Sequence, residues 1–125
     1  MTGTVVEVAA AQYVMLTTYK KDGTAVASPL WAAPDGDDML LWTVADSWKV
    51  KRLRRDNRVL VQACDARGRK TIGPQVAGLA TVEDRQPAVD AIIGKYGILG
   101  RLTIWGSSLR RGASGTVGIR VRAVV

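Results

Sequence analysis

Short segments rich in β-branched, aromatic and other apolar residues recur along this chain, and turn-forming residues separate them at close intervals. Asp22 and Gly23 lie between the first two segments, and this dipeptide is typical of a tight hairpin because glycine tolerates a positive φ. Pro29 cannot donate a ladder hydrogen bond, so its strand is expected at a sheet edge or a bulge. The pattern predicts a sheet-dominated fold, with strands over residues 12–19, 24–32, 39–43, 59–64, 70–82 and 116–124.

Two segments have helical spacing instead. In residues 47–56, Val50 and Leu53 lie three positions apart among charged residues, and Ser47 is a suitable N-cap whose hydroxyl can accept a first-turn N–H. Pro87 suits the first position of a second helix, which we expect to end near Tyr96. Residues 101–111 fit either a loop or a short helix. Six strands with two or three short helices predict one mainly β domain over residues 1–125, an antiparallel barrel whose closure removes exposed strand edges.

The composition narrows the chemistry that this chain can perform. It contains no histidine, which excludes Ser-His-Asp, Cys-His and histidine-zinc mechanisms. Its single cysteine excludes an intramolecular disulfide framework and favours a reduced, cytoplasmic setting. No apolar run approaches the ~18 residues of a membrane helix, and the acidic residues show no metal-ligand spacing, so we expect no metal site. If the protein is an enzyme, a bound cofactor must supply the difficult chemistry.

The most informative segment spans residues 43–58. Between residues 47 and 58 it carries six basic residues against one acidic residue, in a chain whose net charge is +7. Lys49 and Lys51 lie near the start of the expected helix, where positive charge opposes the helix dipole and an anion would relieve the conflict. Thr43 and Ser47 add hydroxyls near the same point, which favours a phosphate site. A solvated basic face and a nucleic-acid contact are the alternatives, although no recognised nucleic-acid-binding motif is present.

Three tryptophans lie in or beside this same unit, namely Trp31, Trp42 and Trp48. A planar heteroaromatic ligand could pack against them, although core packing is the commoner role of any one tryptophan. Trp48 differs from the other two because polar and charged residues flank it at the start of the helix. For Trp48, contact with a ligand or a partner subunit is nearly as well supported as core packing.

Together these segments resemble a known family. The run LTTYKKDGTAVASPLWAAPDGDDMLLWT, followed by ADSWKVKRLRRDNRVLVQACDARG, is similar to the flavin- and deazaflavin-binding split β-barrel superfamily, whose best-known member is pyridoxamine phosphate oxidase. The similarity covers residues 12–82, with residues 116–124 as the final strand, and is greatest to the actinobacterial branch that uses the deazaflavin coenzyme F-420. The resemblance implies a six-stranded antiparallel split β-barrel and a homodimer with cofactor sites at the subunit interface.

The resemblance also assigns cofactor contacts, to the ring, to a strand end, to the phosphate and to the anionic tail. The oxidase branch has an arginine where this chain has Trp48, and basic residues in place of Ala27 and Ala32, which argues against pyridoxal-phosphate synthesis. The contacts carried over are Ser28, Pro29, Leu30 and Trp31 along the ring, Trp42 and Thr43 at the strand end, Ser47, Trp48 and Lys49 at the phosphate, Lys51 near the tail, and Gln75 in the place of a cofactor-contacting glutamine.

On this basis we expect an oxidoreductase in which reduced coenzyme F-420 transfers a hydride to a small electron-poor organic substrate. An FMN-binding oxidase or flavin reductase of the same fold and a non-catalytic F-420-binding protein are the alternatives. The sequence assigns no catalytic residue. Tyr13, Tyr19 and Ser28 could donate a proton, but structural hydrogen bonds are the commoner role of such hydroxyls.

Overall fold

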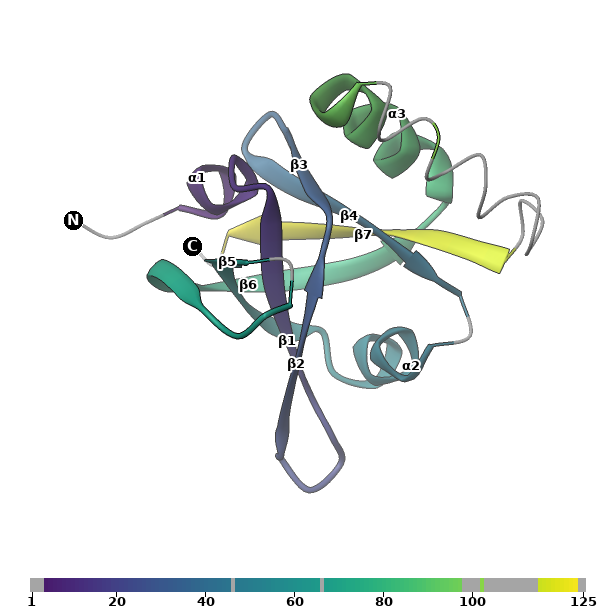
Figure 1. Cartoon of the computed structure of the whole chain (residues 1–125). Coiled ribbons are helices and arrows are strands. Elements are labelled where there is room, and N and C mark those ends of the chain that lie inside the picture. Colours follow the sequence, from purple (N-terminus) through teal and green to yellow (C-terminus); the bar gives the residue numbers. More distant parts are fainter. Residues whose placement is uncertain (1–3, 46, 66, 98–101, 103–114, 124–125) are drawn as a thin grey trace.

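The computed structural model describes residues 4–45, 47–65, 67–97, 102 and 115–123. The seven strands of this part of the chain form one antiparallel sheet in the order β2-β1-β5-β6-β7-β4-β3, which curls around a core (Figure 1). The elements follow in the order α1 (Val5–Ala9), β1 (Tyr13–Tyr19), β2 (Ala25–Leu30), β3 (Ala32–Asp35), β4 (Asp38–Val44), α2 (Trp48–Arg55), β5 (Arg58–Cys64), β6 (Thr71–Glu83), α3 (Arg85–Tyr96) and β7 (Thr116–Ala123).

The two edge strands of this sheet are consecutive in the chain. Strand β2 pairs with β1 and strand β3 pairs with β4, and the single residue Trp31 joins them. The chain therefore crosses from one sheet edge to the other with no ladder between the edges, which makes the barrel split. The predicted mainly β, antiparallel split barrel is confirmed, but with seven strands instead of six. The expected strand over residues 24–32 breaks at Trp31, because its second part pairs at the opposite edge.

The barrel core is formed by side chains that alternate along the strands, as a two-residue period requires. In β4, for example, Met39 and Leu41 point into the core, whereas Trp42 packs on the outer face. Burial of each large apolar side chain contributes roughly 1.5–3 kcal/mol, so these residues account for much of the stability. The largest members of the core are Val5, Val8, Val14, Leu16, Met39, Leu41, Leu53, Val59, Val61, Ile119 and Val121.

Helix α3 covers the outer face of β3, β4 and β7 (Figure 1). Val89 and Ile92 of this helix pack with Ala33 in a second apolar cluster. The close approach depends on Gly118 in β7, because a Cβ at that position would lie 2.8 Å from the carbonyl oxygen of Asp84. The start of α3 is therefore seated directly on the backbone of β7.

The last turn of α3 is tied to two distant segments of the chain. The Lys95 ammonium donates hydrogen bonds to the carbonyl oxygens of Ala9 and Ala32, each at 2.6 Å, and also to that of Ala11. The Tyr96 hydroxyl donates to the same Ala32 carbonyl at 3.1 Å. Burial lowers the pKa of Lys95 to about 8. One ammonium group thus connects α3 with the end of α1 and the start of β3.

Helix α1 is absent from the sequence-based prediction. It has a capping box, in which the Glu7 N–H donates to the Thr4 hydroxyl at 3.2 Å and the Thr4 N–H donates to the Glu7 carboxylate at 3.3 Å. The spacing Thr-x-x-Glu is the sequence signal that could have revealed this helix.

Other boundaries differ more modestly. Helix α3 begins at Arg85, so Pro87 is its third residue instead of its first. The reason is that Asp84 serves as the N-cap and accepts a hydrogen bond from the Gln86 N–H at 3.0 Å. Strands β6 and β7 match the expected strands to within one residue at each end. The choice between loop and short helix for residues 101–111 lies outside the described residues, apart from Leu102.

Candidate functional site

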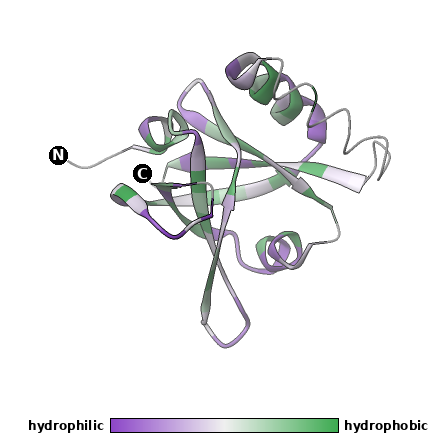
Figure 2. Ribbon diagram, viewed as in Figure 1, coloured by the Kyte–Doolittle hydropathy of each residue, from purple (hydrophilic) through white to green (hydrophobic). Residues whose placement is uncertain are grey.

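Helix α2 follows strand β4 after a short turn at one end of the barrel. In this turn the Ser47 N–H donates to the carbonyl oxygen of Val44 at 3.2 Å. Val50 and Leu53 are buried, and the helix contacts strands β1 and β6. Figure 2 shows hydrophilic residues along α2 and at the tip of the β1–β2 hairpin. The sequence periodicity is therefore realised, and the charged side of the helix faces outward.

The first turn of α2 has polar groups without partners. Ser47 is the N-cap, but its hydroxyl makes no capping bond and is buried without a hydrogen-bond partner among the described residues. The expected capping bond is therefore wrong. The turn contains no acidic residue, and its N–H groups have no acceptor within the helix.

Lys49 lies beside this turn and is partly buried. It forms no ion pair within the described part of the chain. Two effects lower the pKa of Lys49. The larger is the loss of hydration on burial, and the smaller is the nearby positive charge of Arg52. A buried hydroxyl, free N–H groups and an ammonium with no carboxylate partner are the donor set that suits a phosphate.

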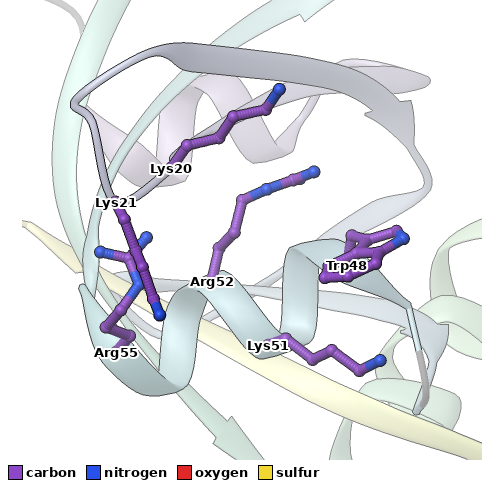
Figure 3. A pocket seen from close by; sticks show the side chains of 6 residues that line it. All are labelled: Lys20, Lys21, Trp48, Lys51, Arg52 and Arg55. Atoms are coloured by element: carbon purple, nitrogen blue, oxygen red, sulfur yellow. The ribbon is translucent and has the colours of Figure 1, made fainter.

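A basic pocket of about 520 Å³ lies between α2 and the turn that joins β1 to β2 (Figure 3). Its helical residues occupy positions i, i+3, i+4 and i+7, which share one face. The Lys51 ammonium lies 4.6 Å from the centre of the Trp48 ring, and Trp48 is 70% exposed. None of the described residues that line the pocket is acidic; they are Lys20, Lys21, Trp48, Lys51, Arg52 and Arg55.

Two guanidinium groups of the basic pocket are held in place by neutral oxygens. Arg55 donates to the carbonyl oxygen of Tyr19 at 2.6 Å, and Arg52 donates to the hydroxyl of Thr18 at 3.4 Å. Because both acceptors are uncharged, these bonds orient the guanidinium groups without neutralising them. The pocket therefore keeps its positive charge.

The structure brings four of the predicted cofactor contacts together at α2. Trp48, Lys49 and Lys51 belong to the helix, and Ser47 precedes it. Thr43 is buried near the end of β4, one short turn before them. These five residues lie between the end of β4 and the fourth residue of α2.

Trp31 and Trp42 are placed differently. The Trp31 ring stacks on that of Tyr96, with centroids 4.4 Å apart and an interplanar angle of 14°. Trp42 packs against the same cluster beneath α3, and its indole N–H is buried with no acceptor among the described residues. Both tryptophans therefore serve the packing of α3, in contrast to the exposed Trp48.

The predicted ring contacts on β2 lie at the sheet edge, as the proline indicated. Leu30 packs against the barrel core, and Ser28 lies opposite Leu16. Pro29 instead lies opposite Met15. Gly68 lies close to Pro29, because a Cβ on Gly68 would be only 3.3 Å from the proline ring. The turn that contains Gly68 therefore packs over this part of β2.

Gln75 lies on an exposed stretch of β6. The strand is irregular near Gly73, which has a φ of 75°, and the pairing with β5 shifts register there. The Gln62 side chain spans the irregularity by donating to the Gly73 carbonyl oxygen at 2.8 Å. Gln75 is thus presented beside a bulge, remote in sequence from the α2 contacts.

Sequence reasoning did not assign Lys20, Lys21 or Arg52 to the site. The signal was present, because Lys20 and Lys21 directly precede the Asp22-Gly23 turn. What the sequence lacked was the position of this turn opposite the outward face of α2 (Figure 3).

The remaining chemistry of the described residues is limited. No group of three or more His, Cys, Asp or Glu side chains in this part of the chain could hold a metal ion. Cys64 is buried, and burial together with the charge of Asp65 raises the pKa of its thiol, so it is not an activated nucleophile. None of the described helices has the length and apolar character needed to span a membrane.

The fold is a split barrel with a basic helix beside its sheet, and the family of proteins with this fold can now be named. The sequence profile of the family described as pyridoxamine 5′-phosphate oxidase matches residues 1–121. The chain therefore belongs to this family, whose fold binds flavin-type cofactors. The resemblance stated from the sequence is confirmed at this level.

Solved structures with the same fold have diverse descriptions. A conserved hypothetical protein from Mycobacterium tuberculosis has a TM-score of 0.69 at 21% identity, over 94% of this chain and 76% of that chain. An F-420 reductase has a TM-score of 0.64 at 15% identity, over 100% and 97% of the two chains. The heme storage protein HutZ from Vibrio cholerae has a TM-score of 0.61 at 11% identity, over 95% and 87%. No curated protein matches the sequence.

Proposed function

We propose that this protein is a cytoplasmic oxidoreductase that uses coenzyme F-420 to reduce a small electron-poor organic substrate. The observation that carries this proposal is the unsatisfied first turn of α2, where Ser47 has a buried hydroxyl without a partner in the described chain and Lys49 has no carboxylate. Membership of the family and the fold shared with an F-420 reductase support the same reading.

In this proposal the first turn of α2 holds the coenzyme phosphate. The Ser47 hydroxyl and the free N–H groups donate to phosphate oxygens, and Lys49 supplies a partly desolvated positive charge. Trp48 forms a wall of this site, and Lys51 faces the anionic tail beyond the phosphate. Thr43 lies at the strand end that leads into the same turn.

The ring of the coenzyme is proposed to lie near β2, with contacts to residues 28–31 and to Gln75 and Trp42. When bound, the reduced coenzyme supplies a hydride to the substrate. Trp31 is held rigid by its stack on Tyr96, so it would position the ring or the substrate with little loss of conformational entropy. No side chain is assigned as a catalytic residue, and the role of the chain is binding and orientation.

A homodimer is part of this proposal. Ile72 is 63% exposed and Leu79 is 42% exposed, and both lie on β6. Their pairing partners, Ala63 and Arg58, place Ile72 and Leu79 on opposite faces of the sheet. A second copy of the chain that covered the first part of β6 would bury Ile72 and place Gln75 at the subunit interface.

The test is direct titration of purified protein with coenzyme F-420 and with FMN. We expect F-420 to bind, and a Ser47→Ala/Lys49→Ala variant to bind it about 100-fold more weakly, since one charge-assisted and one neutral hydrogen bond are lost. Lys70→Ala is the matched control, because Lys70 is an exposed lysine in the β5–β6 turn. Clear FMN binding with no F-420 binding would replace the proposal with a flavin oxidase or flavin reductase.

Two other outcomes would redirect the proposal. If reduced F-420 binds but no member of a broad panel of electron-poor acceptors oxidises it, the protein is a coenzyme-binding module without catalysis. If duplex DNA binds with strong salt dependence, and the Ser47→Ala/Lys49→Ala variant binds it equally well, the basic helix serves nucleic acid instead.

A further inference from the structure

The basic pocket carries more positive charge than the proposed coenzyme phosphate requires. Lys20, Lys21, Arg52 and Arg55 line it and have no part in the phosphate site at Ser47 and Lys49. Arg52 and Arg55 donate to neutral oxygens, and neither forms an ion pair within the described residues. Like charges gathered on one face destabilise the unliganded protein, and an anion would relieve this repulsion.

Among the described residues, Asp22 and Asp56 lie next to the pocket residues in sequence, and both have hydrogen-bond partners outside the pocket. Asp56 pairs with Arg58, with a 2.8 Å contact to Nη2 and a 3.0 Å contact to Nε. Asp22, next to the two turn lysines, accepts a hydrogen bond from the Thr24 N–H at 2.9 Å and does not line the pocket. Within the described chain, Asp22 and Asp56 act on Lys20 and Arg55 through longer-range electrostatic attraction, but no carboxylate forms an ion pair with a residue that lines the basic pocket.

We propose that the basic pocket is a second anion-binding site, distinct from the phosphate donors Ser47 and Lys49 although Trp48 and Lys51 border both, and that it takes a compact polyphosphate such as the di- or triphosphate of a nucleotide. Five cationic residues line a single cavity of about 520 Å³. A polyphosphate carries its negative charges closer together along its chain than a run of carboxylates does. The two anchored guanidinium groups match phosphate oxygens in a bidentate manner.

Trp48 gives the site an aromatic rim. Its ring is 70% exposed, and the Lys51 ammonium approaches it at 4.6 Å from the ring centre. A base attached to the polyphosphate could stack on the exposed ring, as bases do on aromatic platforms in other nucleotide sites. The pocket therefore favours a nucleotide over an inorganic chain of equal charge.

The test measures binding of tripolyphosphate and of ATP by calorimetry at about 150 mM salt, where exposed charges are largely screened. We expect Lys20→Ala/Lys21→Ala to weaken both ligands about tenfold, since two ammonium–phosphate contacts are lost. The matched control is Arg69→Ala/Lys70→Ala, which removes two exposed cations from the β5–β6 turn and should change affinity less than about twofold. Trp48→Leu should weaken ATP at least about fivefold while tripolyphosphate is unaffected.

Several results would overturn this inference. Oligoglutamate of equal charge binding as tightly as tripolyphosphate would assign the pocket to the coenzyme tail. An equal loss in the control variant would indicate diffuse attraction by the net charge. Binding only to vesicles of an anionic phospholipid, with no affinity for free polyphosphate, would indicate a lipid surface instead.

The two proposals fail separately. The Ser47→Ala/Lys49→Ala variant should lose F-420 affinity yet keep polyphosphate affinity within about threefold, because neither residue lines the basic pocket. A parallel loss of both ligands would mean a single site and would overturn the second site. Polyphosphate binding by a protein that does not bind F-420 would reject the proposed function and leave this inference intact.

Discussion

We expect removal of the Lys95 ammonium to lower the free energy of unfolding markedly, although it changes the side-chain volume little. It donates to three carbonyl oxygens from two segments, those of Ala9 and Ala11 beyond α1 and that of Ala32 at the start of β3. Lys95→Met keeps the aliphatic chain and removes the donors. The variant therefore isolates the hydrogen bonds from the packing of the side chain.

The magnitude follows from the number of bonds and from their partial burial. A hydrogen bond to a charged group contributes roughly 1.5–3 kcal/mol, but water can replace part of this because the Lys95 side chain is only partly buried. We therefore expect Lys95→Met to lower the free energy of unfolding by about 3 kcal/mol at pH 7, or the Tm by about 10 °C.

The pH dependence supplies a second, independent readout. Burial lowers the pKa of Lys95 from 10.5 to about 8, so between these values the unfolded chain binds more protons than the folded chain. The free energy of unfolding of the wild type therefore rises with pH across this interval. This pKa difference corresponds at most to a rise of about 3.4 kcal/mol in the free energy of unfolding. Because Lys95 is partly exposed, we expect a rise of about 1–2 kcal/mol. Lys95→Met lacks this increase.

The assay is urea unfolding followed by circular dichroism at pH 7, 8, 9 and 10, with Lys70→Met as the control for loss of an exposed lysine. The difference in free energy of unfolding between the wild type and Lys95→Met should increase as the pH rises. The difference between the wild type and the control should stay near zero. Parallel curves, or a Tm within about 2 °C of the wild type at pH 7, would refute the reasoning.

Two further predictions concern other parts of the fold. Arg120 pairs with Asp35 at 2.9 Å, Asp38 at 3.0 Å and Glu83 at 3.2 Å. Arg120→Met should therefore lower the free energy of unfolding by about 2 kcal/mol in urea titrations at pH 7, and an unchanged value would contradict the ion-pair account. Ile72→Lys should convert the proposed dimer to monomer in analytical ultracentrifugation, and an unchanged sedimentation coefficient would place the interface elsewhere.

Local signals accounted for most of the fold. Gly23 adopts a φ of 88°, and the Lys20 N–H donates to the Thr24 carbonyl oxygen at 2.9 Å, so the Asp22-Gly23 turn closes as its residues predict. The break at Trp31 has no comparable signal, because it depends on how far the sheet curls before its two edges meet. The strand count was therefore wrong by one, while the antiparallel barrel was right.

The site divides in the same way. The basic charge of α2 and the position of Ser47 could be predicted, because both depend on a few adjacent residues. Whether the Ser47 hydroxyl would find an acceptor could not, since burial of a single atom depends on the packing of the whole turn. The environments of Trp31 and Trp48 could not be predicted from composition either. In the structure Trp31 stacks on Tyr96, whereas Trp48 is exposed.

By itself, the sequence determined the alternation of strands and turns, the single amphipathic basic helix, and the exclusion of histidine-based chemistry. Turn preference, helix period and charge act over a handful of residues, so they can be evaluated along the chain. Only the tertiary structure decided that Lys20 and Lys21 face Arg52 and Arg55 across one cavity. These residues are some thirty positions apart along the chain. They lie close together because burial of the shared core holds the β1–β2 turn and α2 at a fixed separation.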